Sequence, residues 1–328
     1  MNESSALSFP RLVGDIGGTH ARFAMVLRPD SAPVAAAIYR CNDFATLWDA
    51  LQRYLAEHAP VRPLVGALGV ATAVTGDQVC FTNLAWSFSR AELQEQLEVE
   101  RLLVINDFSA LALALPVLTA DELQQVGGGT PKSGAPLGLI GPGTGLGVSG
   151  LLPTPDGFGQ IAISGEGGHV TLSSFDNEAQ PVLQWLHDHF GHVSAERVLS
   201  GPGLENLYQA ICVLNYRRRP ALSAQRIAEA ALAASDKACV KALSLFCGLL
   251  GDVAGNLALT LGARGGIYIG GGIVPRLADW FVRSTFRERF ESKGRFSEYL
   301  RAIPTYVVQS RISPALIGAS RALDMPSH

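Results

Sequence analysis

Positive charge is sparse in this chain and does not gather anywhere along it. The 328 residues include 26 lysines and arginines against 29 aspartates and glutamates, which gives a formal net charge of -3. A protein that follows a nucleic-acid backbone needs a stripe or cluster of basic side chains to meet the phosphates. We therefore expect no nucleic-acid partner.

Long apolar runs are also missing. The opening stretch MNESSALSFP contains an acid and no basic cluster, which is unlike a signal peptide. We find no later apolar run that reads as long enough to cross a membrane. These features predict a cytoplasmic protein without a membrane partner.

Cysteine is scarce, and no two cysteines form a C-x-x-C pair. The five cysteines stand in apolar stretches, as Cys41, Cys80, Cys212, Cys239 and Cys247. This arrangement favours reduced thiols in a hydrophobic core over a metal site.

The length of the chain, about twice that of a typical domain, favours two domains. Residues 11–26 predict two strands around a Gly-Gly turn, and residues 137–152 repeat that pattern. The segment 101–107 predicts a buried strand that ends on two polar residues, followed by a helix that stops near Pro116. Strands and helices alternate, which indicates the α/β class, and the two similar hairpins suggest a duplicated architecture with two halves facing a cleft.

Glycine, by contrast, is over-used: the chain has 35 glycines, and many of them gather in three clusters. These clusters are GDIGGT at 14–19, GPGTGLG at 141–147 and GGG at 270–272. Without a Cβ to keep a ligand away, successive backbone N–H groups can point at phosphate oxygens. Any one cluster could equally make a plain hairpin turn, but the three together favour phosphate binding and a nucleotide site.

Two familiar nucleotide motifs do not account for these clusters. Gly145, Gly147 and Gly150 fit G-x-G-x-x-G, but LLPTPDGFG follows them in place of the helix that a dinucleotide fingerprint needs. No G-x-x-x-x-G-K-[ST] sequence occurs, which excludes a P-loop NTPase.

Asp15 is a lone charge in an apolar strand pattern, beside the first glycine cluster. Mg²⁺ typically uses one or two carboxylates plus substrate phosphates and keeps several waters. Asp15 is therefore a candidate to hold Mg²⁺ through water. The alternative is a capped turn, in which its carboxylate accepts a hydrogen bond from the N–H of Gly17 or Gly18.

Asp107 follows Asn106 where a predicted strand gives way to a helix, a place where open α/β sheets bind ligands. A carboxylate there can accept the proton of an attacking hydroxyl group during phosphoryl transfer. The alternative is a helix N-cap, a role that Asp fills about as well as Asn.

Three further polar side chains are candidates for binding a ligand rich in hydroxyl groups. Glu166 and His169 lie in SGEGGH, whose glycines make a helix interior unsuitable; plain loop surface and metal ligation are the alternatives, but no third metal ligand stands nearby. Glu196, in SAERVLSG, could instead favour the positive end of a helix that begins at Ser194.

Seven motifs occur in a recognisable order and cover nearly the whole chain. They are LVGDIGGTHARFA, TNLAWSFS, INDFSALA, GPGTGLG, SGEGGHV, ERVLSGPGLENLY and GGIYIGGGIVPR. With them the chain resembles the bacterial ATP-dependent glucokinases, members of the sugar kinase, actin and heat-shock-ATPase superfamily. The cysteine-rich zinc motif of the related repressor and open-reading-frame kinases is absent.

The resemblance implies an α/β protein with the two-domain actin-like ATPase fold, which is ribonuclease H-like and has an interdomain cleft. Residues 1–116 would form a small α/β domain, completed by a C-terminal helix at 312–328. Residues 117–311 would form a large α+β domain. Glucose would lie in the cleft and ATP against the large domain, and the family also suggests a homodimer.

The resemblance further implies roles for individual residues. Asp107 would be the general base. Glucose would be bound by Asn83, Asn106, Asp107, Glu166, His169 and Glu196. ATP would be contacted by Gly14, Asp15, Ile16, Gly17, Gly18, Thr19, Gly141, Gly143, Thr144, Gly145, Gly270, Gly271 and Gly272, with Mg²⁺ held by Asp15 through water.

On these grounds we predict a glycolytic glucokinase that transfers the γ-phosphoryl group of MgATP to the 6-hydroxyl of glucose. Two alternatives stay open. One is a non-catalytic sugar sensor on the same fold, and the other is an actin-like or chaperone ATPase.

Overall fold

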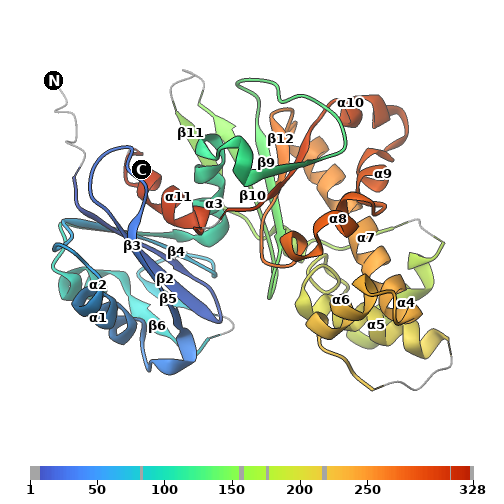
Figure 1. The fold of residues 1–328 in the computed structure, drawn as a ribbon, viewed down its shortest axis with the longest axis horizontal. Helices are drawn as coiled ribbons and strands as arrows, with labels where there is room; N and C mark the ends of the chain where they lie inside the picture. Colours follow the sequence, from blue (N-terminus) through green and yellow to red (C-terminus); the bar gives the residue numbers. More distant parts are fainter. Residues whose placement is uncertain are drawn as a thin grey trace. The chain divides into compact units, whose positions relative to one another are not determined.

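The computed structural model describes residues 8–81, 84–154, 159–174, 177–215, 220–310 and 312–325. They form two compact units, each with its own sheet and hydrophobic core (Figure 1). The first unit contains residues 1–119, 154–164 and 310–328, and the second contains residues 120–153 and 165–309. Both units combine helices with strands, which confirms the predicted α/β class.

The two units differ from the domain limits that we predicted. Residues 117–119, 154–164 and 310–311, predicted in the large domain, group with the first unit. Strand β11 (Gln160–Ile163), in the longest of these segments, packs against helix α3 (Asp107–Ala114) of that unit.

A five-stranded sheet forms the centre of the first unit, in the order β3-β2-β1-β4-β7. Strand β2 runs antiparallel to both of its neighbours, whereas β1, β4 and β7 are parallel. A separate small sheet pairs β5 with β6. The strands are β1 (Arg11–Ile16), β2 (His20–Val26), β3 (Val34–Arg40), β4 (Val65–Val70), β5 (Gln78–Cys80), β6 (Ser87–Ser89) and β7 (Arg101–Asn106).

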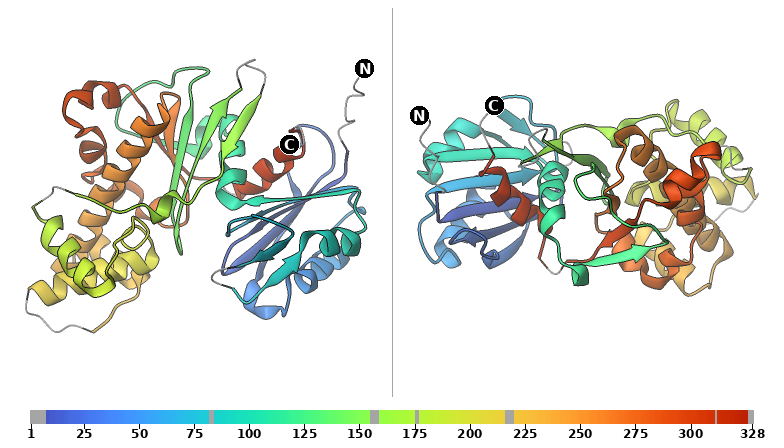
Figure 2. Two further views of the ribbon diagram at one scale, coloured as in Figure 1. Left: turned by 180° about the vertical axis from the view of Figure 1, so that it is seen from behind. Right: turned by 90° about the horizontal axis from the view of Figure 1, so that it is seen from above.

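Helices cover both faces of this sheet: α1 and α2 lie on one face, and α3 and α11 lie on the other (Figures 1 and 2). Their bounds are α1 (Leu47–Glu57), α2 (Arg90–Leu97), α3 (Asp107–Ala114) and α11 (Pro314–Ala322), with the 3₁₀ helices η1 (Cys41–Asp43) and η2 (Leu115–Val117). Helix α1 begins at a capping box, in which Thr46 and Asp49 exchange hydrogen bonds. Helix α3 ends at Ala114 and η2 follows it, consistent with the predicted stop near Pro116.

Helices α3 and α11 come from distant parts of the chain and pack closely together. Gly318 permits this approach, because a Cβ there would overlap the carbonyl oxygen of Ala110. Helix α11 also packs against β1 and β4. The buried Arg11 of β1 donates hydrogen bonds to the Ser320 carbonyl (2.7 Å) and to the Asp324 carboxylate. The C-terminal helix is thus part of the first unit and supports α3, which begins at Asp107.

The strands of the second unit are arranged in the order β10-β9-β12-β13-β8. Strand β9 pairs antiparallel with β10 and parallel with β12, and β12 pairs parallel with β13. This is the order and direction of β2-β1-β4-β7, as the predicted duplication requires. The strands are β8 (Leu123–Val126), β9 (Leu137–Pro142), β10 (Leu146–Pro153), β12 (Gly266–Ile269) and β13 (Thr305–Val308).

The long helix α7 of the second unit packs against α5, α6 and α9. Helices α4, α5 and α6 gather in one cluster (Figure 1). The helices are α4 (Ala179–Phe190), α5 (Gly201–Leu214), α6 (Ala224–Leu232), α7 (Lys237–Leu261), α8 (Ala278–Val282), α9 (Phe286–Glu291) and α10 (Ser297–Arg301), with η3 (Ala120–Glu122), η4 (Gly167–His169), η5 (Val274–Leu277) and η6 (Gly294–Phe296).

Helix α7 corrects our expectation about apolar runs. By length and composition alone it could cross a membrane, although 78% of its most apolar 18-residue window is buried inside the structure. Asp252, near its middle, forms an ion pair with Arg289 of α9. A helix that is apolar and mostly buried is typical of the core of a globular protein.

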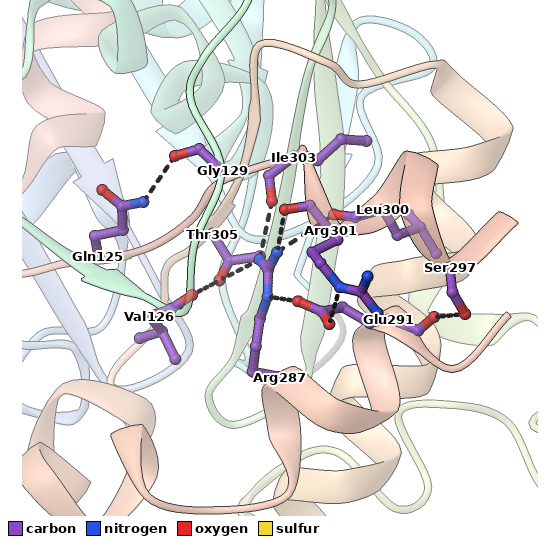
Figure 3. Close-up of polar contacts among 10 residues, drawn as sticks. All are labelled: Gln125, Val126, Gly129, Arg287, Glu291, Ser297, Leu300, Arg301, Ile303 and Thr305. Atoms are coloured by element: carbon purple, nitrogen blue, oxygen red, sulfur yellow. Dashed lines mark hydrogen bonds and ion pairs between the residues drawn. The ribbon is translucent and has the colours of Figure 1, made fainter.

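Arg287 of α9 donates hydrogen bonds to several segments next to strand β13 (Figure 3). Its guanidinium donates to Glu291 Oε1 (2.6 Å) and to the carbonyl oxygens of Leu300, Arg301 and Ile303. Thr305, at the start of β13, donates in turn to the Val126 carbonyl of β8 (2.5 Å). These bonds satisfy carbonyl groups at the end of α10 and support β13, the neighbour of β12.

The cysteines follow the prediction at four of five positions. Cys41, Cys212, Cys239 and Cys247 are buried, but Cys80 is exposed. In β5 the side chains alternate, and because Val79 points into the core, Cys80 points outward.

The close packing of α3 and α11 gives a test of the fold. We expect Gly318→Ala to lower the free energy of unfolding by about 3 kcal/mol, because the new methyl group must push two helix backbones apart. Gly76→Ala is the matched control, since a Cβ at Gly76 would have no heavy atom within 4 Å. Urea unfolding would measure both changes, and equal stabilities for the two variants would contradict this account.

Candidate active site

The polar candidates of the first unit lie at one edge of its sheet. Ile16, Val70 and Asn106 are aligned across the parallel strands β1, β4 and β7. The turn at 17–19 and the start of α3 at Asp107 therefore follow the carboxyl ends of strands in the same sheet. This edge is where open α/β sheets bind ligands, so the structure brings the first glycine cluster and Asp107 to the same side.

Asp15 is 8% exposed and sits opposite Arg22 in the β1–β2 hairpin. Its Oδ2 accepts hydrogen bonds from Arg22 (3.2 Å) and from the Ser313 hydroxyl (2.6 Å). The N–H of Gly17 donates to the His20 carbonyl (3.0 Å), as in a hairpin turn. For Gly17, the alternative of a turn capped by Asp15 is therefore wrong.

The structure shows which residue caps helix α3, a question that the sequence left open for Asp107. The N-cap residue is Asn106, whose Oδ1 accepts from the N–H groups of Phe108 (3.0 Å) and Ser109 (3.2 Å). Asp107 is the first residue of the helix, and its Oδ1 also accepts from Phe108 N–H (2.9 Å). The interpretation of Asp107 as the N-cap is thus wrong, and the cap does not require its carboxylate.

In the second unit, the glycine loop 141–147 is held on two sides. The Gly143 carbonyl accepts from the N–H of Gly201 (2.8 Å), the first residue of α5. On the other side, Ile273 N–H donates to the Pro142 carbonyl (3.4 Å), and a Cβ at Gly271 would overlap that carbonyl. The second and third glycine clusters, far apart in sequence, are therefore in contact.

Glu196 lies against the same glycine loop. Its Oε2 accepts a hydrogen bond from the backbone N–H of Leu146 (2.8 Å). The nearest helix begins at Gly201 with Ser200 as its N-cap. The alternative of a helix beginning at Ser194, with Glu196 in its first turn, is therefore wrong.

Glu166 and His169 are both exposed; Glu166 precedes the short 3₁₀ helix η4, and His169 is its last residue. Their side chains approach within 4.0 Å, from Glu166 Oε2 to His169 Nε2. The Gly168 carbonyl between them accepts from Glu196 N–H (2.8 Å), and a Cβ at Gly168 would overlap the Leu146 carbonyl. The structure thus joins this loop, Glu196 and the glycine loop into one polar site of the second unit.

The remaining predictions concern the G-x-G-x-x-G match, Asn83 and possible metal ligands. The segment after Gly145 is strand β10 rather than a helix, which confirms that the G-x-G-x-x-G match is accidental. Asn83 lies outside the described residues. Across the described ranges, no group of three or more His, Cys, Asp or Glu side chains is arranged to hold a metal ion.

Sequence reasoning missed the partners of Asp15. Arg22 could have been found, because a hairpin around the Gly-Gly turn places it directly opposite Asp15. Ser313 has no such local signal, because its contact with Asp15 joins the two ends of the chain. The backbone of Leu146 was missed as the partner of Glu196 because fifty residues separate the two in the chain.

Comparison with known proteins gives concordant matches over almost the whole chain. The sequence model of the family described as "Glucokinase" matches residues 12–325. The glucokinase of Aromatoleum aromaticum is 54% identical over 318 residues, covering 97% of this chain and 95% of the relative. The glucokinase of Chromobacterium violaceum is 48% identical over 317 residues, covering 96% and 90%. A crystal structure of glucokinase from an Antarctic psychrotroph has a TM-score of 0.86 at 36% identity, covering 96% of this chain and 98% of that one.

The cap of α3 can be tested directly. We expect Asn106→Ala to lower the free energy of unfolding by about 1 kcal/mol, because Ser109 N–H loses its side-chain acceptor. Asn106→Asp keeps an acceptor and should stay within a few tenths of a kcal/mol of the parent. Urea denaturation measures both variants. An alanine variant as stable as the parent would refute the assignment of Asn106 as the cap.

Proposed function

Since this chain belongs to the glucokinase family, we infer that it transfers the γ-phosphoryl group of ATP to the 6-hydroxyl of glucose, giving glucose 6-phosphate and ADP. This is the entry reaction of glycolysis. The full-length match to glucokinases at 54% identity is the observation that carries this function. The similarity to the solved structure of the psychrotroph glucokinase, with a TM-score of 0.86, supports the two-domain actin-like kinase fold.

We propose Asp107 as the general base. It stands at the carboxyl edge of the sheet, where β7 ends and α3 begins. Because Asn106 caps the helix, the Asp107 carboxylate can accept the proton of the attacking 6-hydroxyl without loss of the cap. General-base assistance of this kind contributes about 10² to 10⁴ in rate.

Glu166, His169 and Glu196 are proposed to bind hydroxyl groups of glucose, together with Asn83 and Asn106. The approach of Glu166 to His169, and the hydrogen bond from Glu196 N–H to the Gly168 carbonyl between them, support this set. Asn106 can contribute only part of its amide, because its Oδ1 is engaged by the helix cap and its Nδ2 lies 3.5 Å from the Thr72 carbonyl.

For the nucleotide, we propose that backbone N–H groups in the first two glycine clusters contact the phosphates and that Gly270–Gly272 lie near the adenosine. The contact between Gly271 and Pro142 supports a continuous surface for the last two clusters.

We propose that Asp15 holds Mg²⁺ through water. The side chain fits this role, because its hydrogen bonds with Arg22 and Ser313 both use Oδ2 and neither engages Oδ1. When bound, Mg²⁺ would neutralise negative charge on the phosphates. A cytoplasmic location and a homodimer stay predictions.

A coupled assay for glucose 6-phosphate tests the function against both alternatives. Purified protein should form glucose 6-phosphate from ATP only when glucose is present. A sugar sensor would bind glucose and form no product, and an actin-like or chaperone ATPase would consume ATP at the same rate without sugar. Either result would reject the proposed reaction.

The role of Asp107 predicts the outcome of a conservative substitution. Asp107→Asn should lower kcat by at least about 10², because the amide cannot take up a proton. Thermal unfolding and glucose binding should match the parent, since Asn106 still caps α3. The coupled assay measures kcat, and a variant that keeps more than a tenth of the parent turnover would exclude Asp107 as the base.

A further inference from the structure

Glu196 connects two loops of the second unit through two different chemical groups. Its backbone N–H donates to the Gly168 carbonyl (2.8 Å), in the loop with Glu166 and His169. Its side-chain Oε2 accepts from the backbone N–H of Leu146 (2.8 Å), at the end of the glycine loop. One half-buried residue therefore bonds both the loop proposed for sugar and the loop proposed for phosphate.

The glycine loop has room for this carboxylate. A Cβ on Gly145 would lie 2.5 Å from Glu196 Oε2, so the absence of a side chain at 145 lets the carboxylate rest on the loop backbone. Within the loop, Gly143 N–H donates to the Gly145 carbonyl (2.8 Å), and the Gly143 carbonyl binds Gly201 N–H. Glu196 adds a side-chain hydrogen bond next to Gly145, on the strand β10 side of the turn.

Charge and hydrogen bonding at Glu196 act on nucleotide affinity with opposite signs. A carboxylate near phosphates repels them, so charge alone makes removal of Glu196 favourable for nucleotide binding. A carboxylate that accepts from a backbone N–H keeps the loop in place, so removal of the acceptor is unfavourable. If Glu196 acted only through its charge, its removal would therefore tighten nucleotide binding, whereas loss of a loop-positioning bond would weaken nucleotide binding even when no sugar is present.

We infer that Glu196 is a positioning residue for the glycine loop 141–147 as well as a sugar-binding residue, so that nucleotide affinity depends on its side-chain oxygen even without sugar. This inference rests on the proposed function, because it takes the loop as a phosphate site.

The test compares Glu196→Ala with Glu196→Gln. The Kd of the non-hydrolysable ATP analogue AMPPNP is measured by calorimetry, with magnesium present and glucose absent. The alanine variant should bind about tenfold more weakly, because the loop loses its acceptor. The glutamine variant keeps an acceptor oxygen and loses the charge, so it should bind no more weakly than the parent. An alanine variant as tight as the parent, or a glutamine variant as weak as alanine, would overturn the inference.

A second variant approaches the same bond from the loop. In Gly145→Ala the new methyl group displaces the Glu196 carboxylate and should weaken AMPPNP binding about fivefold or more. If this effect passes through Glu196, adding Gly145→Ala to Glu196→Ala should cause no further loss. Additive losses in the double variant would show that the methyl group acts on the nucleotide directly, and the inference would fall.

Glu166→Gln is the matched control for loss of a carboxylate in the sugar loop. Its described side-chain contact is with His169, so AMPPNP affinity without glucose should stay within about twofold of the parent. Urea unfolding of each variant checks that the fold is kept. If the parent protein phosphorylates glucose but the Glu196→Ala and Gly145→Ala variants bind AMPPNP as tightly as the parent, only this inference is overturned. A parent that binds no AMPPNP overturns the proposed function as well.

Discussion

Both units depend on close contacts between backbones that a side chain would prevent. In the first unit, Gly318 of α11 lies against the Ala110 carbonyl of α3, and in the second, Gly168 and Gly271 lie against the carbonyls of Leu146 and Pro142. At these positions the peptide groups of separate segments touch directly. Because the peptide unit is planar and stiff, such contacts fix the distance between segments more narrowly than flexible side chains can. The polar groups of the candidate site are attached to these fixed segments.

The charged groups near these contacts are consequently satisfied by neighbours before any ligand binds. Asp15 accepts from Arg22 and Ser313, and Glu196 accepts from the backbone of Leu146. A buried carboxylate without partners would be costly, so these bonds make it possible to keep negative charge beside the first two glycine clusters. The same bonds orient each carboxylate. A site built in this way needs little rearrangement of its side chains within each unit when ligands arrive.

The sequence predicted the parts that depend on neighbouring residues. Both hairpins and the strand ending at Asn106 follow from local patterns, and the resemblance added the terminal helix. Sequence-based prediction failed where a local pattern fitted two structures, or where the hydrogen-bond partner of a residue lay far away in the chain. Asn106 and Asp107 are equally good caps, and only the backbone shows which one precedes the helix. The sequence around Glu196 resembled the start of a helix. The bond of Glu196 to Leu146, fifty residues away in the chain, leaves no local pattern that could have corrected this interpretation. The residues alone suggested candidate roles and left alternatives open, and the family resemblance favoured one role for each.

The duplicated hairpins show how one architecture can carry two kinds of chemistry. In each unit an antiparallel hairpin leads into two parallel strands, β2-β1-β4-β7 and β10-β9-β12-β13. The first hairpin has its carboxylate within the strand, at Asp15, paired across the hairpin with Arg22. The second hairpin has no acid in its turn, GPGTGLG. The carboxylate of Glu196, from a separate segment, accepts a hydrogen bond from this turn instead. A carboxylate fixed in a strand suits a metal ion beside phosphates, whereas one held by a separate segment can respond to that segment's own ligand. The glycine loop 141–147 is therefore the one whose geometry can depend on the separate segment that carries Glu196.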